Sequence, residues 1–410
     1  MSPSTKKILL ILALLGTSVL IGIGLYFMFR SAAAPRRLPP VTPGETIPGQ
    51  LPAAGERPST TTPGEGMPAE GGLPEAGRIQ GRVPPSYTKP APVNQLTDNY
   101  VTFPSLSKGG NLRYHNASDG KFYRILPNGE TRELSDQVFY NVNKVTWARN
   151  KDQAVLEYPD GSKIVYNFET RTQVSLPRHW REFSFSNEGN QIAAKSMALA
   201  PENRWLVVTN DNGTGTQLIE HLGDYADEVQ VNWSPSRQTV AFSQTGEPLG
   251  AYRREILLLG TQGENFKSLT VEGTGFVPQW SPTGKRLLYS VYSSRSNFKP
   301  ELWIVNAYGD SIGSGRQLLN LSTWADKCSF GSDTLLFCAV PRALEQGAGM
   351  AREIANDTPD DLYKIDLRTG LRSPISLGGE FTIKDISYDS TRNRVIFTDM
   401  ARQGVFEAPL

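Results

Sequence analysis

The sequence has few of the side chains on which metal sites and nucleophilic catalysis depend. It contains 3 histidines (His115, His179 and His221) and 2 cysteines (Cys328 and Cys338) among 410 residues. Neither set has the spacing of an HExxH or Cys/His metal motif. We therefore expect no metal ion and no cofactor, although a fold that gathers distant residues at one axis could still assemble a metal site.

A large excess of charge of one sign is also absent. Residues 1–92 carry nine basic side chains against five glutamates, and the remaining 318 residues carry 33 basic and 36 acidic side chains. A slightly acidic region of this kind has no basic footprint for a phosphate backbone. The composition therefore argues against a nucleic-acid partner.

Helical periodicity is nearly absent as well. No window keeps it for twelve residues or more, except weakly over Ala343 to Ile354. A strand–turn–strand pattern recurs instead, with an aromatic anchor, a polar turn and an apolar run. It is clearest in Trp280-Ser281-Pro282-Thr283-Gly284 and in Trp233-Ser234-Pro235-Ser236. Looser copies begin at Trp147, Phe185, Phe330 and Tyr388.

The spacing of these anchors indicates the architecture. They follow one another every 38 to 58 residues, and a repeat of roughly 40–50 residues made only of strands is typical of a β-propeller blade. Residues 93–410 would allow about 45 residues for each of seven blades. We predict an all-β, seven-bladed propeller, with six blades as the alternative. In blade five we expect strands at Val277–Trp280, Arg286–Tyr292, Glu301–Ala307 and Arg316–Leu321.

The Trp-Ser-Pro-x-Gly hairpins resemble the WD-like (PD40-like) repeats of TolB-type propellers. Leu302-Trp303-Ile304-Val305-Asn306-Ala307-Tyr308-Gly309-Asp310 also resembles that family, and Asp361-Leu362-Tyr363-Lys364-Ile365-Asp366 is a second copy. The resemblance covers about three quarters of the chain and is strongest in blades four and five. It implies an extracytoplasmic propeller of six or seven blades, used mostly for protein binding.

The N-terminal region has a different composition. Residues 8–29 are 22 residues without a charge, about 33 Å as a helix, which matches a bilayer core of ~30 Å. This favours an uncleaved signal-anchor over a cleaved signal peptide, because the apolar run exceeds the ~7–15 residues of a signal peptide's apolar h-region. We predict a cytoplasmic tail and transmembrane helix in residues 1–30, so that the membrane itself is one partner.

Residues 31–92 contain 14 prolines and 9 glycines and cannot bury enough apolar surface to order themselves. We predict that they form a disordered linker that holds residues 93–410, the propeller, away from the membrane. The short N-terminal tail places the propeller outside the cytoplasm, in the periplasm or cell envelope. An inverted anchor would instead make it a cytoplasmic scaffold.

One segment has the pattern of a hydrolase nucleophile. Gly309-Asp310-Ser311-Ile312-Gly313 matches G-x-S-x-G, but that motif requires a strand-to-helix turn followed in order by an acid and a histidine. All three histidines precede it. We therefore interpret this segment as a turn between strands, and we expect the protein not to be an enzyme.

The connections from the second to the third strand lengthen in blades three to six. Long loops on a rigid scaffold are where binding sites usually lie, although neutral insertions would give the same pattern. Those of blades four to six carry aromatic and basic side chains, which dominate protein interfaces. We predict a surface for a protein or peptide partner at Tyr252, Arg253, Arg254, Arg295, Phe298, Lys299, Arg342 and Arg352. The alternative function is a propeller enzyme, a hydrolase or lyase with an axial pocket.

Two predictions concern covalent and topological closure. Residues 93–97 resemble the outer strands of other blades, so we expect them to complete the final blade beside the C-terminal strand. Cys328 and Cys338 flank a hairpin turn. If Phe330 pairs with Leu336, the cysteines lie opposite each other and a disulfide becomes feasible. A two-residue turn would put the two thiols out of line.

Overall fold

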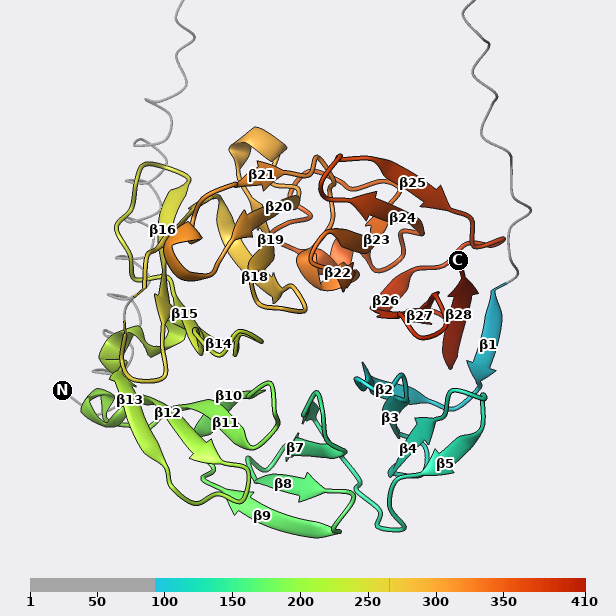
Figure 1. Ribbon diagram of the computed structural model, residues 1–410, viewed down its shortest axis with the longest axis horizontal. Helices are drawn as coiled ribbons and strands as arrows, with labels where there is room; N and C mark the ends of the chain where they lie inside the picture. Colours follow the sequence, from blue (N-terminus) through green and yellow to red (C-terminus); the bar gives the residue numbers. More distant parts are fainter. Residues whose placement is uncertain (1–92, 265) are drawn as a thin grey trace, which may run out of the picture. The chain divides into compact units, whose positions relative to one another are not determined.

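The computed structural model describes residues 93–264 and 266–410, where strands form seven sheets of four antiparallel strands each. Figure 1 shows these sheets following one another around a ring in chain order. The all-β, seven-bladed propeller is therefore confirmed, and the six-bladed alternative is wrong.

Each blade runs from an inner strand to an outer strand. Blade one comprises β2 (Val101–Leu106), β3 (Leu112–Asn116), β4 (Lys121–Ile125) and β5 (Thr131–Glu133). Blade two comprises β6 (Lys144–Trp147), β7 (Gln153–Glu157), β8 (Lys163–Asn167) and β9 (Thr172–Leu176). Blade three comprises β10 (Trp180–Phe185), β11 (Gln191–Ser196), β12 (Trp205–Asn210) and β13 (Gln217–His221). Blade four comprises β14 (Val229–Val231), β15 (Ala241–Ser243), β16 (Arg253–Leu259) and β17 (Leu269–Glu272). Blade five comprises β18 (Thr274–Trp280), β19 (Arg286–Tyr292), β20 (Glu301–Asn306) and β21 (Gln317–Leu318). Blade six comprises β22 (Cys328–Ser332), β23 (Leu335–Pro341), β24 (Asp360–Asp366) and β25 (Arg372–Ile375).

The seventh blade joins the two ends of the described chain. It consists of β26 (Ile383–Asp389), β27 (Arg394–Asp399), β28 (Val405–Pro409) and the first strand, β1 (Asn94–Thr97). The pairing of β1 with β28 is antiparallel, and Figure 1 shows β1 beside β28 at the C-terminus. The predicted closure of the ring by residues 93–97 is confirmed.

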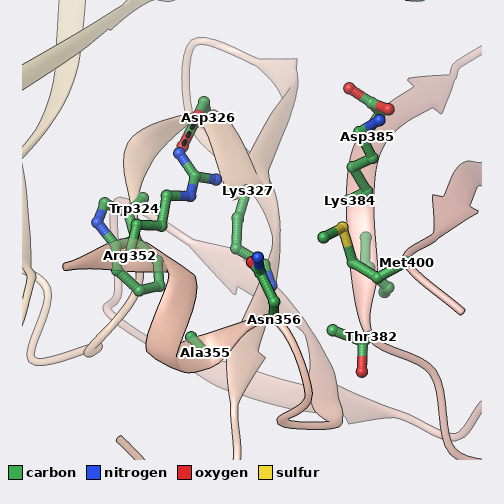
Figure 2. A pocket seen from close by; sticks show the side chains of 11 residues that line it. Trp324, Asp326, Lys327, Arg352, Ala355, Asn356, Thr382, Lys384, Asp385 and Met400 are labelled. Atoms are coloured by element: carbon green, nitrogen blue, oxygen red, sulfur yellow. Dashed lines mark hydrogen bonds and ion pairs between the residues drawn. The ribbon is translucent and has the colours of Figure 1, made fainter. Parts of the chain in front are cut away.

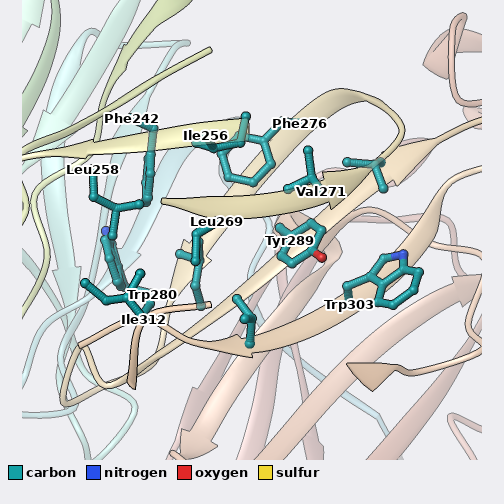
Figure 3. Close-up of a cluster of buried hydrophobic side chains, with 14 residues drawn as sticks. Phe242, Ile256, Leu258, Leu269, Val271, Phe276, Trp280, Tyr289, Trp303 and Ile312 are labelled. Atoms are coloured by element: carbon teal, nitrogen blue, oxygen red, sulfur yellow. The ribbon is translucent and has the colours of Figure 1, made fainter. Parts of the chain in front are cut away.

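The anchor aromatics pack between neighbouring blades. Trp280 ends the inner strand of blade five, and its ring stacks on Phe242 of blade four with centroids 5.2 Å apart. Its indole N–H donates to the Asn232 carbonyl at 3.2 Å, so the buried nitrogen is satisfied. Figure 3 shows both rings in one apolar cluster with Leu258 and Ile312. The repeating aromatic therefore joins each blade to the one before it.

The glycine of the recurring turn has a steric cause. Gly284 has a φ of +71°, and a Cβ there would lie 2.5 Å from the Ser234 Oγ and from the Ser236 backbone nitrogen. Those two atoms belong to the corresponding turn of the preceding blade. Only glycine combines this left-handed conformation with so close a contact between turns.

The expected strand limits hold best where the hairpin pattern is strongest. Arg286–Tyr292 agrees at both ends, whereas the outer strand of blade five is only Gln317–Leu318. The weak helical pattern over residues 343–354 is wrong beyond one turn, because the structure has only the 3₁₀ helix η6 (Arg352–Ala355) there. Gly347 has a φ of +89°, which interrupts a helix.

The N-terminal predictions fall outside the described residues. These include the cytoplasmic tail and helix of residues 1–30 and the linker of residues 31–92. Within the ranges that the structure describes, no helix is long and apolar enough to cross a membrane.

Candidate functional site: the upper face of blades four to seven

The alternating strand directions sort the connections onto two faces. Connections from second to third strand, and those between blades, emerge on one face, which we call the upper face; the others emerge on the lower face. Strand β1 leads into β2 across the upper face. Its first residue, Asn94, therefore lies at the lower face, close to Val93, where the described chain begins.

Exposed apolar side chains are concentrated on the upper face. Fourteen large apolar or aromatic residues of the described chain are exposed. Only three of them (Tyr308, Leu371 and Leu410) lie at the lower face. Ten lie on upper-face connections: Tyr100, Val138, Tyr140, Leu199, Tyr225, Leu249, Tyr252, Met350, Ile354 and Met400. Single exposed apolar residues are ordinary, and what marks an interaction site is a contiguous patch of them.

The upper-face connections of blades four, five and six touch one another. The rings of Tyr252 and Phe298 meet edge to face, with centroids 6.3 Å apart. The Gly349 N–H, from blade six, donates to the Phe298 carbonyl at 2.7 Å, and the Gly347 N–H donates to the Asn297 carbonyl at 3.1 Å. Two predicted site residues thus lie together, and we call residues 249–254, 294–299 and 347–354 the loop surface.

Phe298 is held in an unusual conformation. Both Asn297 and Phe298 have positive φ angles, 53° and 56°, which is rare for a bulky side chain. The 3₁₀ helix η3 (Ser294–Ser296) precedes them, and the Ser293 N–H donates to the Ser296 Oγ at 3.2 Å. Backbone strain of this kind persists where surrounding contacts enforce it, and it is concentrated at functional sites.

Most of the predicted arginines form ion pairs within the chain. Arg254 lies 3.5 Å from Glu228. Arg295 lies 2.7 Å from Glu272, and its guanidinium sits 5.5 Å from the Trp303 ring centroid.

Arg342 is paired in the same way, on the side of the loops that faces blade seven. It contacts Asp361 at 2.9 Å and Glu380 at 2.7 Å. Arg253 and Lys299, in contrast, have no ion pair within the described chain. The structure thus brings Tyr252 and Phe298 together, whereas Arg254, Arg295 and Arg342 pair with separate carboxylates within the chain.

Arg352 points to a second feature, a cavity of about 280 Å³ between blades six and seven. Figure 2 shows η6 on one side of it and the start of β26 on the other. The cavity is lined by Trp324, Asp326, Lys327, Arg352, Ala355, Asn356, Thr382, Ile383, Lys384, Asp385 and Met400. All of these come from upper-face connections or the first residues of β26, so the cavity opens on the upper face.

Lys327 forms a buried ion pair at this cavity. Its Nζ lies 2.8 Å from Asp360 Oδ2, and the two side chains are 6% and 0% exposed. The same carboxylate oxygen accepts from the Ile383 N–H at 2.7 Å. Burial lowers the pKa of Lys327 and raises the pKa of Asp360, and each effect is partly offset by the partner's charge. The pair links η5 (Ala325–Lys327) to β24 and β26.

The histidines do not gather here. None lines the cavity, and in residues 93–264 and 266–410 no group of three or more His, Cys, Asp or Glu side chains could hold a metal ion. The G-x-S-x-G segment forms the 3₁₀ helix η4 (Gly309–Ser311) between β20 and β21, in agreement with a turn.

Sequence reasoning found Arg352 but missed the rest of the cavity. Its residues come from four separate places in the chain, 324–327, 352–356, 382–385 and Met400. Each is an ordinary blade connection or strand start when considered alone. Only the position of all four at the junction of blades six and seven distinguishes them, and no local pattern in the sequence carries that information.

The sequence matches no family model and no curated protein. Solved structures share its fold. An oligogalacturonate lyase in complex with manganese is 13% identical, with a TM-score of 0.55, over 78% of this chain and 93% of that one. An oligogalacturonate lyase from Vibrio parahaemolyticus is 12% identical, with a TM-score of 0.52, over 77% and 93%. The Cps50 (Swd1) β-propeller domain of Myceliophteria thermophila is 14% identical, with a TM-score of 0.52, over 78% and 99%.

These likenesses show the propeller fold, and they do not separate a TolB-type propeller from other kinds. They do correct one expectation. We predicted that the protein is not an enzyme, and this prediction was wrong. Two of these three similar structures are lyases, so the propeller fold gives no ground for excluding an enzyme.

Proposed function

We propose that this protein is a membrane-tethered, extracytoplasmic propeller that binds another protein through the upper face of blades four to six. The observation that carries the proposal is the loop surface. Three adjacent connections form one continuous area, joined by the Tyr252–Phe298 contact and the Gly349–Phe298 hydrogen bond. Aromatic side chains held rigidly at the centre of such an area are the typical anchors of a protein interface.

The point at which the chain enters the propeller supports the tether. Asn94 lies at the lower face, opposite the loop surface. A linker that enters there leaves the upper face accessible to a partner. The proposed membrane helix at residues 8–29 and linker at residues 31–92 rest on composition, and the resemblance to TolB-type propellers supports the same arrangement.

Site-specific photo-crosslinking in intact cells tests this proposal. A photoreactive phenylalanine analogue is placed at Tyr252 or Phe298, and at Tyr308 or Leu371 on the lower face as matched controls. We expect the upper-face positions to crosslink to one protein partner that the lower-face positions do not reach. Equal crosslinking from both faces would contradict the proposed surface.

The identified partner then allows a quantitative test. The double variant Tyr252→Ala/Phe298→Ala should weaken binding by more than about tenfold, because loss of two anchors costs at least ~2 kcal/mol. Tyr308→Ala should leave binding unchanged, and the circular dichroism of both variants should match the wild type. Full affinity in the double variant would place the binding site elsewhere.

A propeller enzyme is the second candidate, favoured by the cavity between blades six and seven. Lys327 lines this cavity and is the candidate base, because burial lowers the pKa of its ammonium group. The similar lyases make oligogalacturonate the first substrate to assay. Formation of an unsaturated product by the wild type, and its loss in Lys327→Met, would establish this activity.

A further inference from the structure

The cavity between blades six and seven has its carboxylates already engaged. Asp326 pairs with Arg352 at 2.5 Å. Asp360 accepts from Lys327 and from a backbone N–H. Asp385 accepts from the Thr398 hydroxyl at 2.7 Å. Each carboxylate thus has one oxygen engaged within the chain, and Asp360, which lies behind the lining, keeps its Oδ1 buried without a hydrogen-bond partner among the described residues.

Donors, in contrast, are still available. Lys384 is exposed and has no ion pair within the described chain. Arg352 uses Nη1 for Asp326, and its guanidinium is held 5.0 Å from the Trp324 ring centroid. Its other nitrogens make no hydrogen bond in the part of the chain that the structure describes. Figure 2 shows Arg352 and Lys384 on opposite sides of the cavity, with the Asn356 side chain between them.

The lining also has an apolar part beside the polar Thr382 and Lys327, and the volume is small. Ile383, Ala355 and the thioether of Met400 line the same space. About 280 Å³ lies just below the ~300–1,000 Å³ typical of small-molecule pockets. The space therefore suits one side chain with an attached acid better than an extended ligand.

The cavity is also continuous with the loop surface along the chain. Gly349 contacts Phe298 through its N–H, and η6 begins three residues later with Arg352. Met350 and Ile354, on the same connection, are both exposed. A polypeptide bound on the loop surface can therefore reach the cavity without leaving the upper face.

We infer that this cavity binds one carboxylate-bearing residue of the partner polypeptide, with its acid between Lys384 and Arg352 and its apolar atoms against Met400. The inference rests on the proposed binding function, of which it specifies the partner's chemistry. The carboxylate can belong to a chain terminus or to an acidic side chain, which share this chemistry.

Methionine-methyl NMR on the full-length protein tests the inference without the partner. The chain has 6 methionines, and Met400 lines the cavity whereas Met197 and Met350 lie outside it. The probes are N-acetyl-leucine, its amide, N-acetyl-glutamate amide and galacturonic acid. We expect at least one of the two acidic amino-acid probes to shift the Met400 methyl in a saturable way, and neutral N-acetyl-leucine amide to leave it in place.

The two acids distinguish the sources. A response to N-acetyl-leucine assigns the site to a chain terminus, and a response to N-acetyl-glutamate amide assigns it to an acidic side chain. Lys384→Gln should raise the dissociation constant of the active probe about fivefold or more, because a charge-assisted hydrogen bond is lost. Lys364→Gln, an exposed lysine on β24 without an ion pair in the described chain, is the matched control.

Three results would overturn the inference. One is an equal response to the acid and the amide, and another is an unshifted Met400 with every probe. The third is a response to galacturonic acid alone, which would assign the cavity to a saccharide. None of these depends on the loop surface, so crosslinking through Tyr252 and Phe298 could still succeed.

Discussion

The Asn94 side chain donates a hydrogen bond to the Glu407 carboxylate at 3.2 Å, although the two residues are 313 positions apart. The register around them pairs Asn94 with Glu407 and Gln95 with Phe406. Leu96 lies between the paired residues Gln95 and Thr97 and packs against the apolar cluster shared by blades one and seven. The ring is thus closed by a single short strand from the N-terminal side of the propeller.

Deletion of residues 93–98 should therefore destabilise the whole ring. It would expose the edge of β28 and remove the Leu96 contact, a loss of several kcal/mol. For a domain of this size we expect the melting temperature to fall by roughly 10 °C, measured by circular dichroism. Deletion of residues 60–65 in the predicted linker is the control. An unchanged melting temperature after the first deletion would show that β1 does not stabilise the ring.

The sequence predicts this closure because local patterns determine it. Residues 93–97 look like an outer strand, and the final blade lacks one. The aromatic anchors likewise predict the positions of the blades, because each Trp-Ser-Pro-type turn forms within a single hairpin. Gly284 shows the same principle at one residue, because its turn is recognisable before its contact with Ser234 is known.

The site is less predictable because its properties depend on which segments meet. Arg342 and Arg352 look equally available in the sequence. Arg342 is paired with Asp361 and Glu380, which come from other segments. Arg352 is paired with Asp326 and also lines a cavity that includes Lys384. Ion pairing and cavity shape are set by packing between blades, so composition reveals the candidate residues and leaves their roles open.

The Lys327–Asp360 pair gives a second prediction. Asp360→Ala leaves a buried ammonium without its carboxylate and should lower the free energy of unfolding by about 3–5 kcal/mol. The double variant Lys327→Met/Asp360→Leu removes both charges and should recover most of that loss. Urea unfolding followed by tryptophan fluorescence measures both. Equal destabilisation in the single and double variants would show that packing, and not the unpaired charge, is responsible.

His115 gives a prediction about pH. Its side chain is buried, with Nε2 3.0 Å from the Phe139 carbonyl oxygen and Nδ1 3.0 Å from the Thr102 hydroxyl. Burial lowers the pKa of His115 from its ordinary value of 6.5. Below pH 6.5 this histidine therefore binds a proton more readily in the unfolded chain than in the folded chain. The free energy of unfolding consequently falls as the pH falls.

His115→Gln removes this titration and keeps a polar side chain. Urea midpoints of the wild type and the variant, measured between pH 7.5 and pH 5, should converge as the solution becomes more acidic. Other titrating groups are common to both proteins and cancel in the difference. A constant difference across the whole range would show that His115 does not contribute to the acid sensitivity.

The last prediction concerns Cys328 and Cys338, which are bonded to each other in the structure. The register pairs Phe330 with Leu336 and places the two cysteines directly opposite each other. This is the first of the two turn geometries considered from the sequence, and the two-residue turn is not formed. The bond closes a loop with a sequence separation of 10, so replacement of both cysteines by alanine should cost about 2–3 kcal/mol of stability. Reduction of the wild type should cost a similar amount, and should have no effect on the double variant.

The same pair reports the compartment. Disulfides persist outside the cytoplasm and are rare within it, so an extracytoplasmic propeller should yield one cross-linked peptide pair when protein from cells is alkylated at once and mapped without reductant. Forced cytoplasmic expression of residues 83–410, the compact unit that contains the propeller, should yield the two alkylated thiols instead and serves as the control. Two alkylated thiols from the full-length protein would argue against the exported orientation, because the register already places the sulfur atoms within bonding distance.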